Sequence, residues 1–222
     1  QGANIPEVLC ANCSFDSAIL TDIALVGDGS KGYVSSSAST SVYLIYFSTG
    51  MANESDKIVI GAGAEPRALA YNPVRNELYV VNATIGSASL RTIDTSKNTL
   101  KNSSIAVGAA PKNVIVSPDG TTIYVCSSYS DQNRVTVIDA TTMDAATGAV
   151  TATIPLSNID PYGMAIAANK LYVVGQSNGR VYVIDLNSRT VIKNISAGVG
   201  AYDAIARPDG AFIYVSLNDN IG

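Results

Sequence analysis

A short sequence pattern returns about every 45 residues along this 222-residue chain. In each copy a hydrophobic run carries a tyrosine followed by a valine, and the five tyrosines are Tyr33, Tyr79, Tyr124, Tyr172 and Tyr214. The steps between them are 46, 45, 48 and 42 residues. A repeat of this length that holds four short strands is typical of a β-propeller, in which each repeat forms one blade. The repeat therefore constrains the fold more than any other feature.

The third repeat can be divided into four strands and their turns. Asn113–Val116 is apolar and β-branched, as expected for a buried strand. Ser117–Gly120 then has turn chemistry, because proline fixes one φ and Asp-Gly supplies the positive φ of a tight hairpin. Three further strands are predicted at Thr122–Cys126, Arg134–Asp139 and Ala149–Ile154. We expect the aspartates that end third strands, Asp94, Asp139 and Asp185, to bond backbone amides of the following turn.

The same division applies to the whole chain and predicts an all-β protein. We expect one β-propeller domain, residues 1–222, built of four-stranded antiparallel blades with about five units visible. The units run approximately over 21–64, 65–110, 111–159, 160–200 and 201–222. The fifth unit supplies only two strands, so the N-terminal segment 5–10 is expected to add a strand to it. One strand is still missing, and an incomplete sheet exposes unpaired backbone groups. Three alternatives follow: the protein continues past Gly222 with more blades, another copy donates the missing strand, which would give a polymer, or the last blade has three strands.

Four segments resemble the YVTN family of β-propeller repeats: Tyr79-Val80-Val81-Asn82, Ser117-Pro118-Asp119-Gly120, Val135-Thr136-Val137-Ile138-Asp139 and Thr153-Ile154-Pro155. The resemblance extends from about Thr21 to the C-terminus. It implies a propeller fold. It implies no single function, because the family includes surface-layer and adhesion-type proteins as well as lactonase-like enzymes.

Composition excludes several classes of site. The chain has no histidine, so it cannot form a histidine metal site or a Ser-His-Asp triad. Lactonase-like relatives are expected to use a histidine, which weakens that alternative. The absence of tryptophan argues against WD-repeat and quinone-dependent dehydrogenase propellers. We expect no metal and no cofactor.

Charge and hydrophobicity limit the partners. Charged residues make up 14% of the chain, the net charge is −4, and no basic stripe is present, so we expect no nucleic-acid partner. No run of 18 apolar residues occurs, so we expect no membrane span.

The chain carries several features of secreted proteins. It starts at Gln1 instead of methionine, which suggests that a leader has been removed. Five N-x-Ser/Thr sequons offer glycosylation sites. They lie at Asn12, Asn53, Asn82, Asn102 and Asn194, and we expect Asn53, Asn82 and Asn102 to be the most accessible. The predicted location is extracellular, at the cell surface.

The three cysteines are Cys10, Cys13 and Cys126. A c-type haem site would need histidine after the second cysteine of the pair, but Ser14 follows it, and a zinc site would need further ligands. The remaining alternatives for Cys10 and Cys13 are a local disulfide, favoured by an extracellular location, or two free thiols. We expect Cys126 to be a small buried core residue.

Alignment of the units on the tyrosine predicts a ring of residues around one end of the central channel. The predicted rim residues are Asp22, Arg67, Lys112, Asn113, Tyr162, Tyr202 and Asp203. Two cations, two carboxylates and two aromatic rings could hold a small polar ligand, a sugar or a cation. The alternative is a solvated rim that binds nothing.

Three functions remain in order of preference. The first is an extracellular structural or adhesive protein without catalysis, a building block of a surface layer, sheath or filament, for which we expect no enzymatic activity. The second is a lectin-like propeller that binds carbohydrate or another small ligand. The third is a lactonase-like hydrolase that relies on carboxylates and a metal. The expected partners are accordingly other copies of the chain, or glycans.

Overall fold

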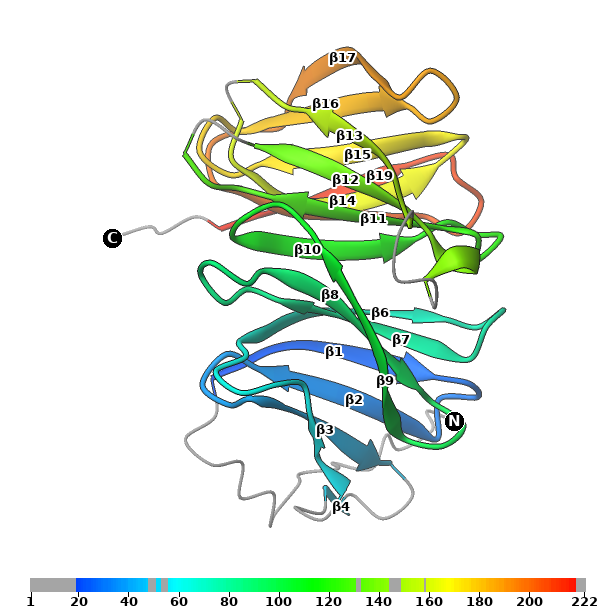
Figure 1. The fold of residues 1–222 in the computed structure, drawn as a ribbon. Coiled ribbons are helices and arrows are strands. Elements are labelled where there is room, and N and C mark those ends of the chain that lie inside the picture. Colours follow the sequence, from blue (N-terminus) through cyan, green and yellow to red (C-terminus); the bar gives the residue numbers. More distant parts are fainter. Residues whose placement is uncertain are drawn as a thin grey trace.

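The computed structural model describes residues 19–47, 51–52, 56–130, 133–143, 149–157 and 159–218. These residues form an all-β fold of antiparallel sheets that follow one another along the chain (Figure 1). The only helical turn assigned an element in this part of the chain is the 3-10 turn η2 (Ala140–Thr142). No helix in it is long and apolar enough to cross a membrane.

Each of the first four sheets is antiparallel and is built from consecutive strands. The first contains β1 (Leu20–Val26), β2 (Lys31–Ser36), β3 (Ser41–Tyr46), β4 (Met51–Ala52) and β5 (Ile58–Val59). The second contains β6 (Pro66–Asn72), β7 (Glu77–Asn82), β8 (Ser89–Asp94) and β9 (Thr99–Ala106). The third contains β10 (Pro111–Val116), β11 (Thr122–Ser127), β12 (Arg134–Asp139) and β13 (Val150–Pro155). The fourth contains β14 (Pro161–Ala167), β15 (Lys170–Gly175), β16 (Arg180–Asp185) and β17 (Thr190–Ser196).

The fifth sheet has two described strands, β18 (Ala201–Ala206) and β19 (Ile213–Leu217). The N-terminal segment 5–10, predicted to add a strand to this sheet, lies outside the described residues. In the first sheet the fourth position is divided, because the two short strands β4 and β5 both pair with β3.

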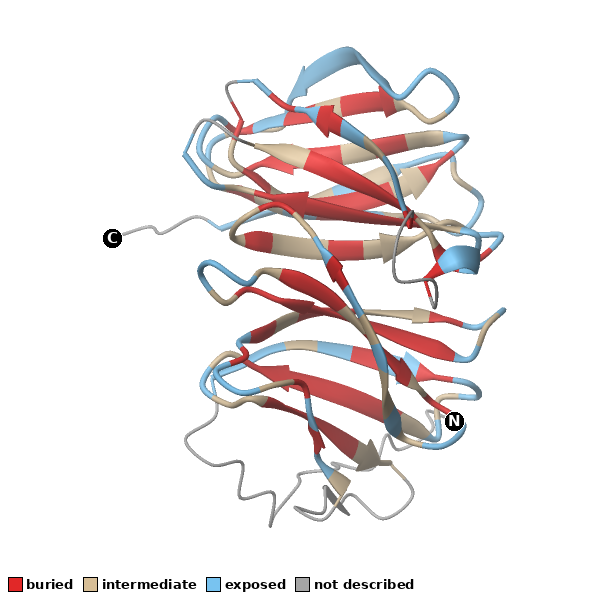
Figure 2. Ribbon diagram, viewed as in Figure 1, coloured by how far each residue is buried: buried red, intermediate tan, exposed pale blue. Residues whose placement is uncertain are grey.

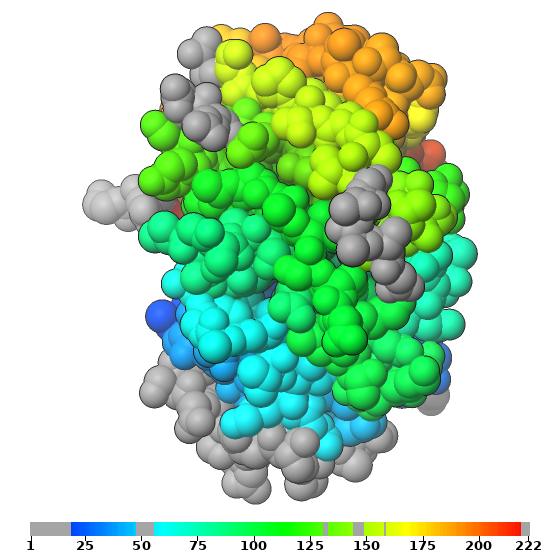
Figure 3. Space-filling view, in the orientation of Figure 1, coloured from blue at the N-terminus to red at the C-terminus, as the bar shows by residue number. Residues whose placement is uncertain are grey.

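The first strands of successive sheets lie side by side: β1 contacts β6, β6 contacts β10, β10 contacts β14, and β14 contacts β18. The space-filling view shows colours that change mainly from cyan through green to orange along the molecule, with little of the fifth sheet, in red, visible from this side (Figure 3). This arrangement is β-propeller-like, with the first strand of each sheet innermost.

The five tyrosines of the repeat occupy equivalent positions, as the sequence predicts. Each lies in the second strand of its sheet and pairs with the fifth residue of the first strand. Those pairs are Ala24 with Tyr33, Ala70 with Tyr79, Ile115 with Tyr124, Ala165 with Tyr172 and Ile205 with Tyr214.

The core fills the spaces between neighbouring sheets, where buried residues concentrate along the strands (Figure 2). Leu69 of the second sheet belongs to the same buried cluster as Tyr33 and Leu44 of the first, and Met164 of the fourth sheet shares a cluster with Val137 of the third. The second strands β2, β7 and β11 are buried on both faces, which explains why they are hydrophobic runs with little alternation.

One charged residue, Glu77, is buried in this core at 4% exposure. Its carboxylate accepts hydrogen bonds from Arg75 Nε at 2.9 Å, Lys101 Nζ at 2.8 Å and the Tyr79 hydroxyl at 2.8 Å. Burial works against ionisation of Glu77, but the three donors outweigh it and lower its pKa.

The turns confirm the role predicted for the strand-ending aspartates. Asp94 accepts from the amide of Ser96 at 2.9 Å, Asp139 from that of Thr141 at 2.8 Å, and Asp185 from that of Ser188 at 2.8 Å. These bonds hold the third-to-fourth strand turns in the same way in three sheets.

Candidate functional site

Every first strand has a register irregularity near its start. The normal pairing with the second strand is interrupted between Leu20 and Asp22, Pro66 and Leu69, Pro111 and Asn113, Pro161 and Met164, and Ala201 and Asp203. A β-bulge of this kind leaves an extra residue unpaired and changes the direction of its side chain. The predicted rim residues lie in or directly beside these bulges.

The bulges bring the predicted rim residues together around one pocket of about 400 Å³, which takes residues from all five sheets. The lining includes Asp22, Arg67, Lys112, Asn113, Tyr162, Tyr202 and Asp203. Sequence analysis did not select Ile19, Leu20 and Ser37, which complete the wall beside the first sheet. Ser37 follows the end of β2, where the alignment on the first strand gives no signal. We call this pocket the channel mouth.

Two tyrosines form an aromatic wall of the channel mouth. The hydroxyls of Tyr162 and Tyr202 are 2.6 Å apart, and their ring centroids are separated by 4.3 Å. Burial and the hydrogen bond with Tyr202 raise the pKa of Tyr162 to about 12, so the Tyr162 hydroxyl keeps its proton near neutral pH. One hydroxyl proton is used within the pair and the other remains for a ligand.

Two cations line the neighbouring part of the mouth without a carboxylate partner. The Nε atom of Arg67 is buried and has no hydrogen-bond partner. The ammonium group of Lys112 lies 6.0 Å from the centre of the Tyr162 ring. Among the described residues no ion pair involves Arg67 or Lys112. A buried donor without an acceptor costs about 1–3 kcal/mol, which an anionic ligand would recover.

The carboxylates of Asp22 and Asp203 also line the mouth. Asp22 accepts from the amides of Ile23 and Leu69, both at 2.8 Å, and thereby joins the first sheet to the bulge of the second. Burial raises the pKa of Asp22, and the nearby Asp203 raises it further. Asp203 accepts from the amide of Ala204 at 2.8 Å and keeps one oxygen without a hydrogen bond.

Cys126 lies directly behind the aromatic wall. Its thiol donates to the carbonyl of Tyr162 at 3.3 Å and the residue is fully buried. Burial raises the pKa of Cys126 to about 12, so the thiol is neither exposed nor ionised. The prediction of a buried core cysteine is confirmed.

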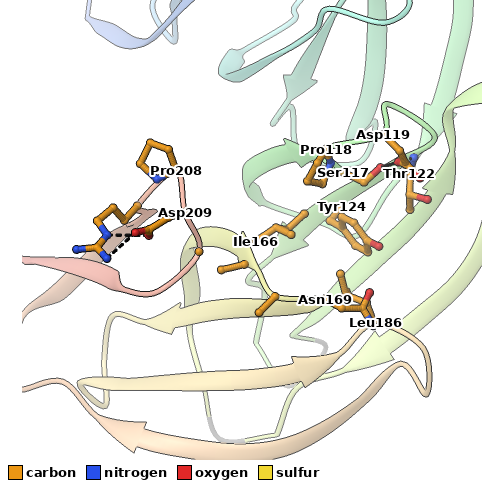
Figure 4. A pocket seen from close by; sticks show the side chains of 14 residues that line it. Ser117, Pro118, Asp119, Thr122, Tyr124, Ile166, Asn169, Leu186, Pro208 and Asp209 are labelled. Carbon is orange, nitrogen blue, oxygen red and sulfur yellow. Dashed lines mark hydrogen bonds and ion pairs between the residues drawn. The ribbon is translucent and has the colours of Figure 1, made fainter.

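A second pocket, of about 580 Å³, opens at the opposite ends of the strands (Figure 4). Its walls are the first turns of the third and fifth sheets, which contain Pro118 and Pro208. The matching turn of the fourth sheet is shorter, because Ala167 pairs with Lys170 and leaves only two residues between them. The short turn leaves the space between its neighbours unfilled. The lining mixes Tyr124 and Ile166 with Asp119 and the Arg207–Asp209 ion pair.

The structure corrects one glycosylation prediction. Asn82 does not lie in an accessible loop: it ends β7, is 8% exposed, and its amide donates to the Ser87 carbonyl at 3.2 Å. Asn102 and Asn194 lie in the outer strands β9 and β17 and are exposed. Asn12, Asn53, Cys10 and Cys13 lie outside the described residues.

The described part of the chain contains no group of three or more acidic or cysteine residues arranged to hold an ion. The Asp-Gly turns are closed by their own amides, as in Asp28 with Ser30 and Asp209 with Ala211.

No family model matches this sequence, and neither does any curated protein. The resemblance to YVTN repeats therefore stays a prediction. By structure, 1280 solved chains are similar, so the fold is widely shared and does not by itself define a function.

One of these structures is hydrazine synthase from Kuenenia stuttgartiensis, with a TM-score of 0.76 and 28% sequence identity. The match covers 88% of this chain and 54% of the other, so this chain spans about half the length of that neighbour. Because that neighbour is an enzyme, the prediction that this chain is not an enzyme is wrong. The absence of histidine was an insufficient argument, since carboxylates, lysine and tyrosine also carry out acid–base chemistry.

Proposed function

We propose that this chain is the β-propeller part of an enzyme and that its channel mouth binds a small charged organic compound. The observation that carries the proposal is the convergence of Arg67, Lys112, Tyr162, Tyr202, Asp22 and Asp203, from five successive sheets, on one pocket. Similarity to hydrazine synthase supports an enzymatic context.

The order of the sheets divides the mouth by charge. The cations come from the adjacent second and third sheets, the tyrosines from the fourth and fifth, and the carboxylates from the fifth and first. A ligand with an anionic group at one end and a protonated amine at the other matches this division. We therefore propose a zwitterion, with its carboxylate at Arg67 and Lys112 and its amine at Asp203.

Asp203 is the better amine acceptor of the two carboxylates. Both oxygens of Asp22 accept backbone amides, and burial raises its pKa, whereas Asp203 is exposed and has an oxygen free of hydrogen bonds. The tyrosine pair supplies a flat wall for the body of the ligand and one hydroxyl donor.

The test is isothermal titration calorimetry with ligands that separate the two charges. The panel is acetate as the anion, methylamine as the cation, glycine and β-alanine as zwitterions, hydrazine for the neighbour's chemistry, and glucose as a neutral sugar. We expect the zwitterions to bind most tightly. Lys112→Met should weaken them by roughly tenfold, which corresponds to ~1.4 kcal/mol.

Lys193→Met is the matched control, because Lys193 is exposed on β17, far along the sheet from the mouth. It should leave binding unchanged. Equal affinity of wild type and Lys112→Met for every compound would contradict the proposal. Preference for glucose over both zwitterions would instead favour the lectin-like function.

A second candidate function is assembly with other copies, as expected for a surface layer or filament. Large apolar residues are exposed on the outer faces of the first and last described sheets: Ile23 is 54% exposed and Leu25 58%, while Ile205 is 68% and Tyr214 56%. The matching residues of inner sheets, such as Leu69 and Tyr79, are buried between neighbours. Light scattering after size-exclusion chromatography should show association of the wild-type chain, and Ile205→Lys should reduce that association. A wild-type chain that is monomeric at all concentrations would exclude assembly through these faces. The extracellular location remains a prediction.

A further inference from the structure

A third pocket, of about 530 Å³, lies between the outer strands of the second sheet and the start of β12. Its lining consists of small residues and one cation, and we call it the serine pocket: Ser87, Ser89, Ser104 and Arg134, with glycine, alanine and valine between them. No carboxylate belongs to the described lining. Hydroxyl donors around a single positive charge, with no bulky side chain in the way, suit a small anion.

Arg134 has no acceptor for its buried donor. Its Nε atom is inaccessible to solvent and without a hydrogen-bond partner, and no ion pair with a described residue involves Arg134. The Arg134 side chain passes close to Gly108, since a Cβ on Gly108 would lie 2.7 Å from Arg134 Nε and 2.6 Å from Ser127 Cβ. Only glycine leaves room for the arginine at this point, and Arg134 lines the same pocket as the serines.

A second arginine, Arg91, lies near this region but outside the pocket lining. It lies two residues after Ser89 in β8 and pairs across the ladder with Ser104 of β9. Its guanidinium group extends toward Gly61, where a Cβ would lie 3.9 Å from Arg91 Nη1. Its Nε is likewise buried without a partner.

Position in the register distinguishes this pocket from the channel mouth. Arg134 pairs with Ser127, and Ser127 pairs with Pro111, where β10 begins. The serine pocket therefore opens at the same end of the sheets as the mouth, but on outer strands, and shares no lining residue with it.

We propose that the serine pocket binds a tetrahedral oxyanion, a phosphate or sulfate group, through the Arg134 guanidinium and the hydroxyls of Ser87, Ser89 and Ser104. Guanidinium groups bind such oxygens with two parallel N–H donors, and serine hydroxyls complete the coordination. The anion can be free or can be carried by a phosphate monoester, because the pocket is open to solvent.

The test is calorimetric titration with inorganic phosphate and with glucose 1-phosphate, at an ionic strength kept constant with chloride. Wild type should bind both, and Arg134→Gln should lower the affinity at least tenfold. Arg180→Gln is the matched control, since Arg180 also begins a third strand but is exposed and donates to Asn194 at 2.7 Å. It should bind as wild type does.

The double variant Arg67→Gln, Lys112→Met separates this site from the channel mouth. If phosphate binding survives in it and is lost in Arg134→Gln, the inference holds whether or not the mouth binds zwitterions. Phosphate binding that is unchanged in Arg134→Gln, or lost only in the double variant, would overturn it. Circular dichroism melting of each variant shows that the loss is not unfolding, and Ser104→Ala, a milder change, should weaken binding by a few fold.

Discussion

Replacement of Glu77 by glutamine tests whether the buried carboxylate stabilises the second sheet. The carboxylate is 5% exposed, whereas its cationic partners Arg75 and Lys101 are 26% and 28% exposed. Glutamine keeps the size and one acceptor oxygen but loses the charge and places an amide donor among three donors. The Tyr79 hydroxyl, which donates to Glu77 at 2.8 Å, is the group most affected because it is fully buried.

The magnitude follows from which groups are left without a partner. Removing one member of a buried ion pair costs ~3–5 kcal/mol when the remaining charge stays buried. Here both cations reach solvent, which reduces the charge contribution, while a buried hydroxyl that loses its acceptor costs ~1–3 kcal/mol. We expect Glu77→Gln to lower the free energy of unfolding by ~2–3 kcal/mol. For a domain of this size the melting temperature should fall by roughly 4–10 °C.

The effect should depend on pH with a definite sign. Three donors hold the pKa of Glu77 below its usual value in the folded protein, so the unfolded chain binds this proton more tightly. The stabilisation is complete above the unfolded pKa, near 4.5, and is lost as pH falls through the folded pKa. The difference in stability between wild type and Glu77→Gln should therefore be largest near pH 7 and should shrink below about pH 4.5.

Urea unfolding followed by circular dichroism measures this difference at pH 7 and pH 3.5. Asp209→Asn is the control, because the Arg207–Asp209 pair is 40% and 55% exposed and should contribute little to stability. If Glu77→Gln were as stable as wild type at pH 7, the cost of burying the carboxylate would cancel its bonds. The reasoning would then be refuted.

Three further predictions concern packing, reactivity and modification. Gly163→Ala should lower stability by ~1–3 kcal/mol in thermal unfolding, because a Cβ on Gly163 would lie 2.4 Å from the backbone of the next sheet. Gly61→Ala is the control and should be nearly neutral, because the nearest atom to its Cβ would be 3.9 Å away. Equal effects of the two substitutions would contradict the close approach of the sheets at Gly163. In a Cys10→Ser, Cys13→Ser variant, Cys126 should react with Ellman's reagent only on unfolding, because the residue is buried and burial raises the pKa of its thiol to about 12. Rapid labelling of the native protein would show that the core around Cys126 opens. In glycosylated material, peptide mass spectrometry should find higher glycan occupancy on Asn102 than on Asn82, because Asn102 is exposed and Asn82 is only 8% exposed. Higher occupancy on Asn82 would place that residue at the surface during modification.

The sequence was sufficient to predict the repeat and the channel mouth because both follow from periodicity. Alignment on the tyrosine assigns the first two strands of every unit. The aligned rim residue lies 12 residues before the tyrosine in four units and 10 residues before it in the fourth, whose first turn is shorter. Asn82 was misplaced because its short polar side chain suggests a loop, whereas the bonds that bury it come from Glu65, Thr84 and Ser87. Such contacts depend on the positions of neighbouring turns, which sequence spacing does not specify.

The serine pocket could not have been predicted by the same route. Arg134 lies at the start of a third strand, where the equivalent residues are Ser89 and Arg180, so the repeat gives no consistent signal. The Arg134 side chain takes its position in the space left by Gly108, which is adjacent in the fold but 26 residues earlier in the chain. The second pocket likewise depends on the short turn after Ala167, a difference in loop length rather than a motif.

The bulge at the start of every first strand separates residues that maintain the fold from a residue that is free to vary. Residues after the bulge pair with the second strand and pack in the core, whereas the bulged residue contributes little to pairing or packing. The five units accordingly carry threonine, arginine, lysine and two tyrosines at this position. If the channel mouth binds a ligand as proposed, substitution at these positions can change its preference while leaving strand pairing intact. A scaffold of this kind allows ligand preference to diverge one repeat at a time, and it offers five positions at which a designer can install a new specificity without redesigning the fold.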